Sequence, residues 1–203
     1  MRRRIVILSC SALAIIALVL LAVFKRADSP EVIATSGGEP LQIAPLRTPH
    51  FMQTDPSWAK EQIGGSREPL SKVGCTICCV AMVLNGYGVT LTPQELNEAL
   101  KQADGYTKDG LLKWDSVATV SNGKVRAVYI GAPNTMEIET ALKRGHPVIA
   151  KVMLRNVVQH WVLIVGKNGT EYLVRDPLKR ELINLSAVAD NLHAIRILKP
   201  VTD

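Results

Sequence analysis

The spacing of apolar residues changes halfway along this chain, and that change limits the fold more than any other feature. Apolar residues recur at helical spacing over 75–86, 92–103 and 110–121, which predicts three helices. After residue 124 the apolar runs become short, rich in β-branched residues and bounded by turns, which predicts strands around one more helix at 135–145. The predicted strands are 125–130, 147–154, 160–166, 171–176 and 193–199.

Turn and capping residues indicate how these elements connect. Asn168 and Gly169, in the segment KNGT, are typical of a tight hairpin, so the strands on either side of them should pair antiparallel. Thr92, Pro93 and Glu95 supply an N-cap, a proline at the first helical position and a capping-box glutamate. Helices first and hairpin-linked strands afterwards predict an α+β domain, with N-terminal helices packed on an antiparallel sheet.

An uncharged apolar run, 5–24, lies between Arg4 and Lys25. As a helix it would be about 30 Å long, which matches the hydrocarbon core of a bilayer. The run is longer than the apolar region of a cleaved signal peptide, and no small-residue cleavage site follows Phe24. We therefore expect an uncleaved signal anchor over 1–26, with one transmembrane helix at about 5–24.

The charges on either side of this run predict its orientation. Arginines and the N-terminal amine precede it, whereas Lys25 and Arg26 are followed by Asp28 and Glu31. The positive-inside rule then places the N-terminus in the cytoplasm. We expect a single-pass protein of the bacterial cytoplasmic membrane, with its folded domain in the periplasm or at the cell surface.

The rest of the chain divides into a linker and one domain. Residues 27–49 contain prolines and a Gly–Gly pair without helical or strand periodicity, which is typical of a linker. Residues 50–203 have a usual length for a single domain. Six Lys/Arg against three Asp/Glu in 1–47 supply half of the net charge of +6, and aromatic residues make up 4% of the chain, so we expect no nucleic-acid partner.

A cysteine at the start of an apolar helix is the strongest local indication of chemistry. Cys75 follows Gly74, and Cys78 and Cys79 lie one turn further along. A helix N-terminus favours the thiolate, which is the reactive form of cysteine, because the macrodipole and the free N–H groups stabilise negative charge there. Position therefore favours Cys75 as a nucleophile, whereas Cys78 and Cys79 are expected to be small buried residues.

A nucleophilic cysteine needs a base, and His160 is the best candidate among the four histidines. His160 begins one predicted strand and Asp176 ends the next, at equal distances from the turn near residue 168. The two side chains should therefore lie side by side, and the carboxylate can hold the imidazole ring. The remaining histidines, His50, His146 and His193, are expected to be structural or exposed.

Several segments in this order resemble one family. They are FMQTDPSWA (51–59), VGCTICCVAMVLNGYGVTLTPQELNEAL (73–100), LKRGHPVIAKV (142–152), HWVLIVG (160–166) and VRDP (174–177). The chain resembles papain-like cysteine peptidases of the bacteriocin-processing, double-glycine type (clan CA), in particular stand-alone, membrane-anchored bacterial members. The resemblance implies a papain-like peptidase fold, and it covers about residues 50–199.

The resemblance also implies roles for individual residues. Cys75 would be the nucleophile, His160 the general acid and base, Asp176 the group that fixes the imidazole, and Gln53 a donor to the oxyanion. The expected activity is hydrolysis of peptide bonds in a peptide or protein substrate, without a metal or an organic cofactor. Two alternatives remain open: a thiol–disulfide oxidoreductase using Cys75 and Cys78, and a catalytically inactive peptide-binding domain of the same fold.

Overall fold

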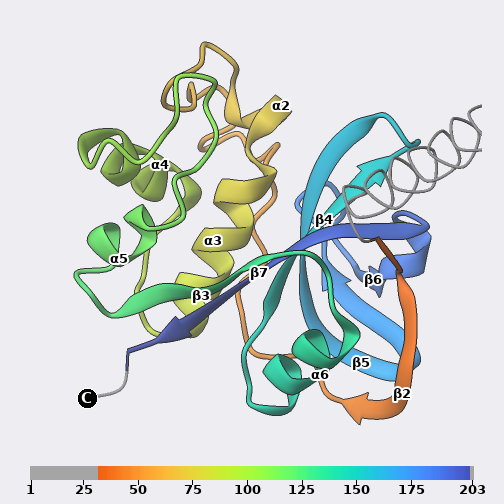
Figure 1. Ribbon diagram of the computed structural model, residues 1–203. Helices are drawn as coiled ribbons and strands as arrows, with labels where there is room; N and C mark the ends of the chain where they lie inside the picture. The colour runs from red at the N-terminus through yellow and green to blue at the C-terminus, as the bar shows by residue number, and fades with distance from the viewer. Residues whose placement is uncertain (1–31, 202–203) are drawn as a thin grey trace, which may run out of the picture. The chain divides into compact units, whose positions relative to one another are not determined.

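The computed structural model describes residues 32–201, which form one compact unit (Figure 1). The predicted signal anchor lies outside these residues, as does the first part of the predicted linker. Within 32–201, no helix is both long enough and apolar enough to cross a membrane.

The unit consists of a helical half and a β-rich half. The helices are α2 (Leu70–Val73), α3 (Cys75–Gly86), α4 (Pro93–Gln102), α5 (Ser116–Val120), α6 (Thr135–Lys143) and a 3₁₀ turn at Leu185–Ala187. The strands are β1 (Ile33–Ala34), β2 (Ser36–Ile43), β3 (Val125–Gly131), β4 (Val148–Leu154), β5 (Val158–Arg175), β6 (Leu182–Asn184) and β7 (Asn191–Pro200).

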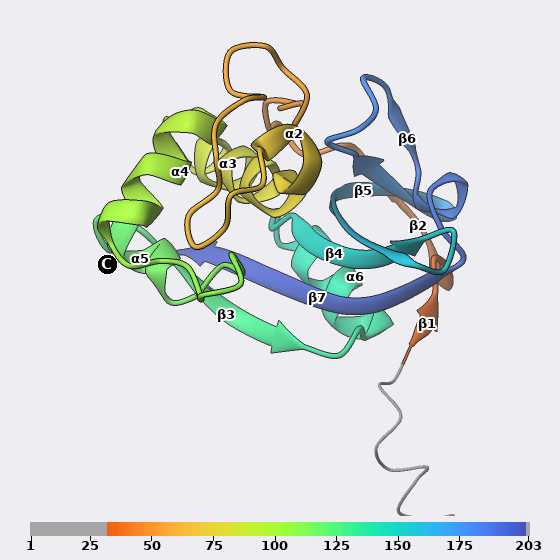
Figure 2. The ribbon, with the colours of Figure 1, turned by 90° about the horizontal axis from the view of Figure 1, so that it is seen from above.

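One antiparallel sheet organises the unit. Its strand order is β1-β7-β4-β5-β2, with β3 paired to β7 and β6 paired to β5. Figure 2 shows β7 as the long strand beside both β3 and β4. The prediction of helices packed on an antiparallel sheet is therefore confirmed.

Both faces of the sheet are covered, which explains why the central strands are apolar without interruption. Alternate residues of a strand point to opposite faces. Ile149 and Leu163 pack with α3 in one apolar cluster, whereas their neighbours Val148 and Val162 pack with α6 in another. Helices α2 to α5 gather on one side of the sheet in Figure 1.

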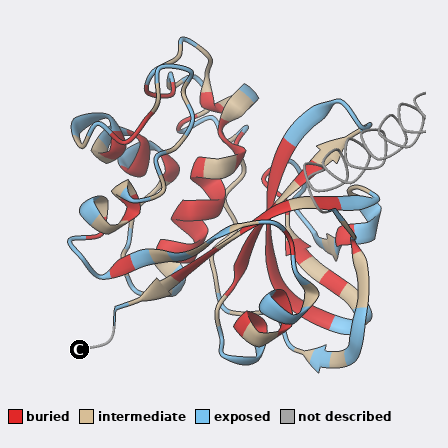
Figure 3. Ribbon diagram, in the orientation of Figure 1, coloured by how far each residue is buried: buried red, intermediate tan, exposed pale blue. Residues whose placement is uncertain are grey.

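Helix α3 is the centre of the helical half and is buried along most of its length (Figure 3). Residues 77–84 have no exposed surface. A helix that is apolar all round is stable only inside a protein, and each fully buried aliphatic side chain stabilises the fold by about 1.5–3 kcal/mol. Burial therefore holds the first turn of α3, which contains Cys75, in a fixed position.

Strand β5 reverses direction along its length. His160 and Asp176 are in hydrogen-bond contact, at 2.7 Å, although a straight strand would separate residues so far apart in sequence by roughly 50 Å. The KNGT segment lies midway between them, and its Gly169 has a φ of 61°, in the left-handed region that glycine adopts without strain. The predicted turn is thus present, inside one continuous strand.

The prediction of a linker over 27–49 is wrong for residues 33–43, which form β1 and β2. Strand β2 pairs with the second half of β5, and Gly37, Gly38 and Pro40 interrupt any alternation of apolar and polar residues in it. Such residues are typical of linkers but also occur in edge strands and bulges. The folded unit therefore begins well before residue 50.

The predicted helix at 110–121 is also too long, because only Ser116–Val120 is helical. Gly110 has a φ of 77°, and Lys113 donates its backbone N–H to Gly105, so this stretch forms turns rather than a helix. Trp114 is thereby placed against Trp161 of the sheet, with ring centroids 5.7 Å apart. Contact with the sheet outweighs the helical pattern here.

Candidate active site

Cys75 is the first residue of α3 and is 8% exposed. Helix α2 runs into α3 through Gly74, whose N–H donates to Leu70 O at 2.8 Å. A side chain at position 74 would collide with that carbonyl, so glycine allows the two helices to join this closely. The next amide, Cys75 N–H, has no backbone acceptor among the described residues. The thiol therefore lies at a helix N-terminus beside a free N–H donor.

His160 and Asp176 form a buried pair close to this thiol. His160 Nε2 donates to Asp176 Oδ1 at 2.7 Å, and the two side chains are 4% and 3% exposed. The same oxygen also accepts the Leu178 N–H at 2.8 Å, which fixes the carboxylate. The Cys75 side chain lies close enough to the imidazole to raise its pKa, and Nδ1 is the ring nitrogen that Asp176 leaves unbonded. The structure brings together the three residues predicted to act as a triad.

The electrostatics of this group favour a charged imidazole. Burial alone would lower the pKa of His160, but its hydrogen bond to the Asp176 carboxylate and its interactions with Cys75 outweigh that effect, and the pKa rises to about 9. At neutral pH the ring is therefore protonated. An imidazolium beside a thiol stabilises the thiolate, which is the nucleophilic form.

Cys78 and Cys79 have no exposed surface, as expected. Burial raises the pKa of both thiols well above the ordinary value, and the neighbouring Cys75 raises it further. The Cys79 thiol donates to Trp161 O at 3.5 Å, inside the apolar core. Both residues are packing residues, and no disulfide joins the described cysteines.

Gln53 is buried, at 3% exposed, and lies beside the start of α3. Its Nε2 donates to Ser71 O at 2.8 Å. In a continuous helix Ser71 O would accept the N–H of Cys75. Here Ser71 O accepts from the Gln53 amide instead, and this amide therefore lies next to the Cys75 N–H. Because Ser71 O can only accept, the amide nitrogen and not its oxygen must face it. Gln53 Oε1 is buried without a hydrogen-bond partner among the described residues.

His50 is a residue of the site that the sequence did not reveal. We expected it to be structural or exposed, and its contact is a structural one, but it falls on a site residue: its Nε2 donates to Asp176 O at 3.0 Å. Gln53 N–H, three residues later, donates to Pro177 O at 3.0 Å. No local pattern marks His50, because its partner is a backbone carbonyl more than a hundred residues away. His146, by contrast, bonds Tyr87 Oη just past the C-terminal end of α3, and His193 is partly exposed on β7.

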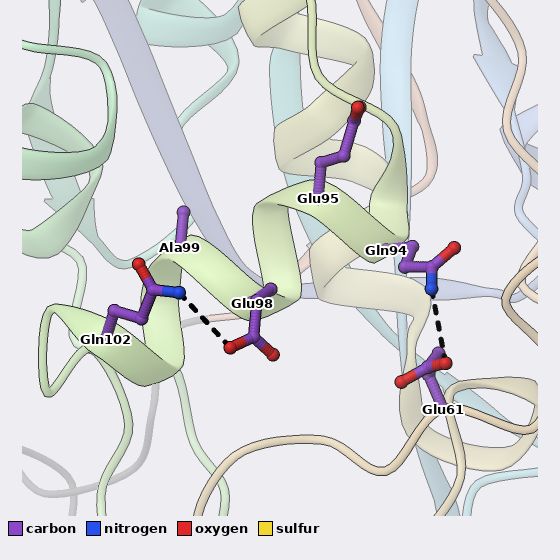
Figure 4. Close-up of a pocket in the computed structure, with 6 residues that line it drawn as sticks. All are labelled: Glu61, Gln94, Glu95, Glu98, Ala99 and Gln102. Carbon is purple, nitrogen blue, oxygen red and sulfur yellow. Dashed lines mark hydrogen bonds between the residues drawn. The ribbon is translucent and has the colours of Figure 1, made fainter.

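A cavity of about 400 Å³ lies elsewhere, along the outer face of α4 (Figure 4). Glutamates and glutamines line it, with Gln94 bonded to Glu61 and Gln102 bonded to Glu98. It contains none of the residues predicted to be catalytic. Within residues 32–201, no cluster of His, Cys, Asp and Glu side chains is arranged to hold a metal ion.

A thiol at a helix N-terminus, next to an imidazole that a buried carboxylate holds at the neighbouring antiparallel sheet, is typical of one class of proteins, the cysteine peptidases. The family comparison agrees. A model of the Peptidase C39 family matches residues 70–189, more than half of the chain, and the chain belongs to that family, the bacteriocin-processing type of cysteine peptidase. It is a hydrolase of the cysteine-peptidase type, with a peptide or protein as substrate. No curated protein matches the chain.

Proposed function

We propose that this chain is an extracytoplasmic, membrane-anchored peptidase that cleaves peptide bonds with a triad of Cys75, His160 and Asp176. One observation carries the triad: the buried Asp176 carboxylate holds one nitrogen of the His160 ring at 2.7 Å and leaves the other nitrogen free, and Cys75 lies close enough to raise the pKa of the ring. A structural histidine would need only the first of these features. The carboxylate holds the ring in the tautomer and orientation that acid–base catalysis requires, and the free nitrogen can exchange a proton with Cys75.

The reaction follows from these positions. The Cys75 thiolate attacks the carbonyl carbon of the scissile peptide bond, forming a C–S bond and an oxyanion. The His160 imidazolium then gives its Nδ1 proton to the leaving amine as the C–N bond breaks, which leaves a thioester on Cys75. Neutral His160 next takes a proton from water, whose oxygen attacks the thioester carbonyl. Release of the acid product restores the thiolate and the imidazolium.

We expect two N–H donors to stabilise the oxyanion. Cys75 N–H has no backbone acceptor among the described residues, and Gln53 Nε2 carries a second hydrogen beyond the one bonded to Ser71 O. A donor aimed at an oxyanion contributes about 3 kcal/mol to transition-state stabilisation. Gln53 lies outside the part of the chain that matches the family model, so this role rests on its geometry.

Peptidase activity is testable without knowledge of the natural substrate. The full-length chain is incubated with a complex peptide mixture, and new peptide termini are identified by mass spectrometry. We expect new termini from the wild-type chain and none from Cys75→Ala, while Cys79→Ala, a matched change one turn further along α3, stays active. Termini that persist in Cys75→Ala would contradict the triad.

The membrane location is part of the proposal and rests on the uncharged run 5–24 and the basic residues that precede it. Protease added to intact bacteria, and to spheroplasts where an outer membrane is present, tests it. We expect the domain to be digested from outside while the chain stays in the membrane fraction. Protection until the cytoplasmic membrane is lysed would contradict the orientation.

The oxidoreductase alternative has no support from the geometry. A redox pair of Cys75 and Cys78 requires Cys78 to form a thiolate, and burial raises the pKa of Cys78 far above neutrality. The same alternative leaves the buried contact between His160 and Asp176 without a role.

A further inference from the structure

Residues 48–53, which we call the arm, lie along the turn that contains Asp176. Arg175 Nε donates to Thr48 Oγ1 at 3.0 Å, His50 Nε2 donates to Asp176 O at 3.0 Å, and Gln53 N–H donates to Pro177 O at 3.0 Å. Three hydrogen bonds therefore tie the arm to three consecutive residues. The arm precedes the part of the chain that matches the family model.

His50 contacts the residue whose carboxylate holds the imidazole. Asp176 O accepts from His50 and also from Lys179 N–H at 2.9 Å, and the latter bond closes the turn. Asp176 Oδ1 meanwhile accepts from His160 and from Leu178 N–H. Because the carbonyl and the carboxylate belong to one residue, a shift of the backbone at Asp176 also moves the acceptor of the His160 bond. Hydrogen bonds weaken steeply as their geometry departs from linear.

We propose that His50 is a positioning residue: by donating to Asp176 O, it holds the Asp176 carboxylate in line with His160 and so keeps the imidazole charged beside Cys75. This inference rests on the proposed triad. His50 does not reach the reacting atoms in this role and acts only through Asp176.

The bond does not depend on the charge of His50. Asp176 O can only accept, so Nε2 of His50 must carry a hydrogen, and it does so both in the imidazolium and in one neutral tautomer. His50 can therefore make this hydrogen bond whether its ring is charged or neutral. The charged groups that face His160 itself are Cys75 from α3 and Asp176 from the turn.

The test uses a matched pair of substitutions in the full-length chain. In His50→Gln the amide nitrogen can take the place of Nε2 and reach Asp176 O. In His50→Asn the amide is shorter and lies where Nδ1 does, so polarity is kept but the bond is lost. His193→Ala, on β7, controls for the loss of a histidine elsewhere.

The readout is the pH at which His160 loses its proton, followed by NMR of isotope-labelled histidine rings. We expect a midpoint near the raised value of about 9 in the wild type, His193→Ala and His50→Gln, and a lower midpoint in His50→Asn. The rate at which iodoacetamide alkylates Cys75 at pH 7 should fall about two- to tenfold in His50→Asn only. A purely structural role would lower the thermal midpoint without moving the titration.

A double substitution shows whether His50 acts through Asp176. In an Asp176→Ala chain there is no carboxylate to position, so adding His50→Asn should shift the His160 titration no further. An additional shift of the same size would overturn the inference, as would a folded His50→Asn chain with the wild-type midpoint. If instead His160 titrates near 6.5 in the wild type, the proposed triad itself is contradicted, and the two failures are distinguishable.

Discussion

Strand β5 contributes to two buried pairs of opposite charge, and they differ in what their hydrogen bonds leave free. At its start, His160 meets Asp176 at 2.7 Å; at its turn, Lys167 meets Glu139 of α6 at 2.5 Å. Both pairs are almost fully buried. Lys167 Nζ also donates to Gly37 O and Glu39 O, at 2.7 Å each, so all three of its hydrogens are bonded. The His160 ring, in contrast, keeps one nitrogen for the Cys75 thiol.

Burial and charge alone therefore do not identify a catalytic pair. Lys167 holds the carbonyls of β2 against α6, and nothing around it is left to move a proton. His160 is fixed on one side only and can exchange a proton on the other. We expect substitutions at the Lys167–Glu139 pair to affect stability, and conservative substitutions at the His160–Asp176 pair to affect activity.

The largest effect should come from His160→Gln. The glutamine amide can still donate to Asp176 and so keep the fold, but it cannot act as an acid or a base. We expect peptide hydrolysis to fall on the order of 10⁴-fold or more, while the free energy of unfolding, measured above about pH 9 where the wild-type imidazole is neutral, changes by less than about 1 kcal/mol. Cleavage of the peptide mixture and urea denaturation measure the two quantities. Activity within tenfold of wild type would remove His160 from the mechanism.

Lys167→Met should show the opposite pattern. It leaves the Glu139 carboxylate buried without its cation, which costs about 3–5 kcal/mol of stability. Cleavage per folded molecule should stay at the wild-type level, because seven residues of strand β5, roughly 23 Å of extended chain, separate Lys167 from His160. Adding Glu139→Gln removes the isolated charge and should recover part of the loss. A change in the urea midpoint too small to detect would show that β2 is held by other contacts.

Gly38→Ala tests the same region by a different route. Gly38 has a φ of 72°, and a methyl group there would collide with Glu139 and Thr135. Gly37 also has a positive φ, of 130°, but the space around it is open. We expect Gly38→Ala to destabilise the fold by about 1–3 kcal/mol and Gly37→Ala by less, measured as thermal midpoints. Equal losses would show that backbone strain, and not contact with α6, decides the effect.

The smallest effect is a dependence of stability on pH that only one pair should show. The pKa of His160 is raised from 6.5 to about 9, so its imidazolium contributes stability that is complete below pH 6.5 and is lost as the pH rises through about 9. Urea midpoints of the wild type and Lys167→Met should therefore fall together over this window. His160→Gln should lack this component. A wild-type curve parallel to that of His160→Gln would contradict the raised pKa.

Much of this arrangement could be predicted from the sequence, because local patterns carry it. Helical spacing of apolar residues predicted α3 over 75–86, and the capping box predicted the start of α4. The KNGT turn, with His160 and Asp176 at equal distances from it, predicted the buried pair. These features depend on residues close together in sequence, or on a single hairpin.

The rest could not be predicted, because its partners are remote and lack side-chain patterns. Strand β2 is recognisable only beside β5, since Gly37, Gly38 and Pro40 resemble a linker. The His50 bond ends on a backbone carbonyl, which any residue could supply. At 110–115, the contact of Trp114 with Trp161 outweighed a helical pattern.

The measurement that tests the triad most directly is the rate at which iodoacetamide alkylates Cys75 at pH 7 in the wild type and in His160→Gln, assigned to Cys75 by mass spectrometry. We expect the rate to fall about tenfold or more in His160→Gln, because the imidazolium that favours the thiolate is gone. If Cys75 reacts equally fast in both proteins, then His160 does not activate it and the proposed mechanism is wrong.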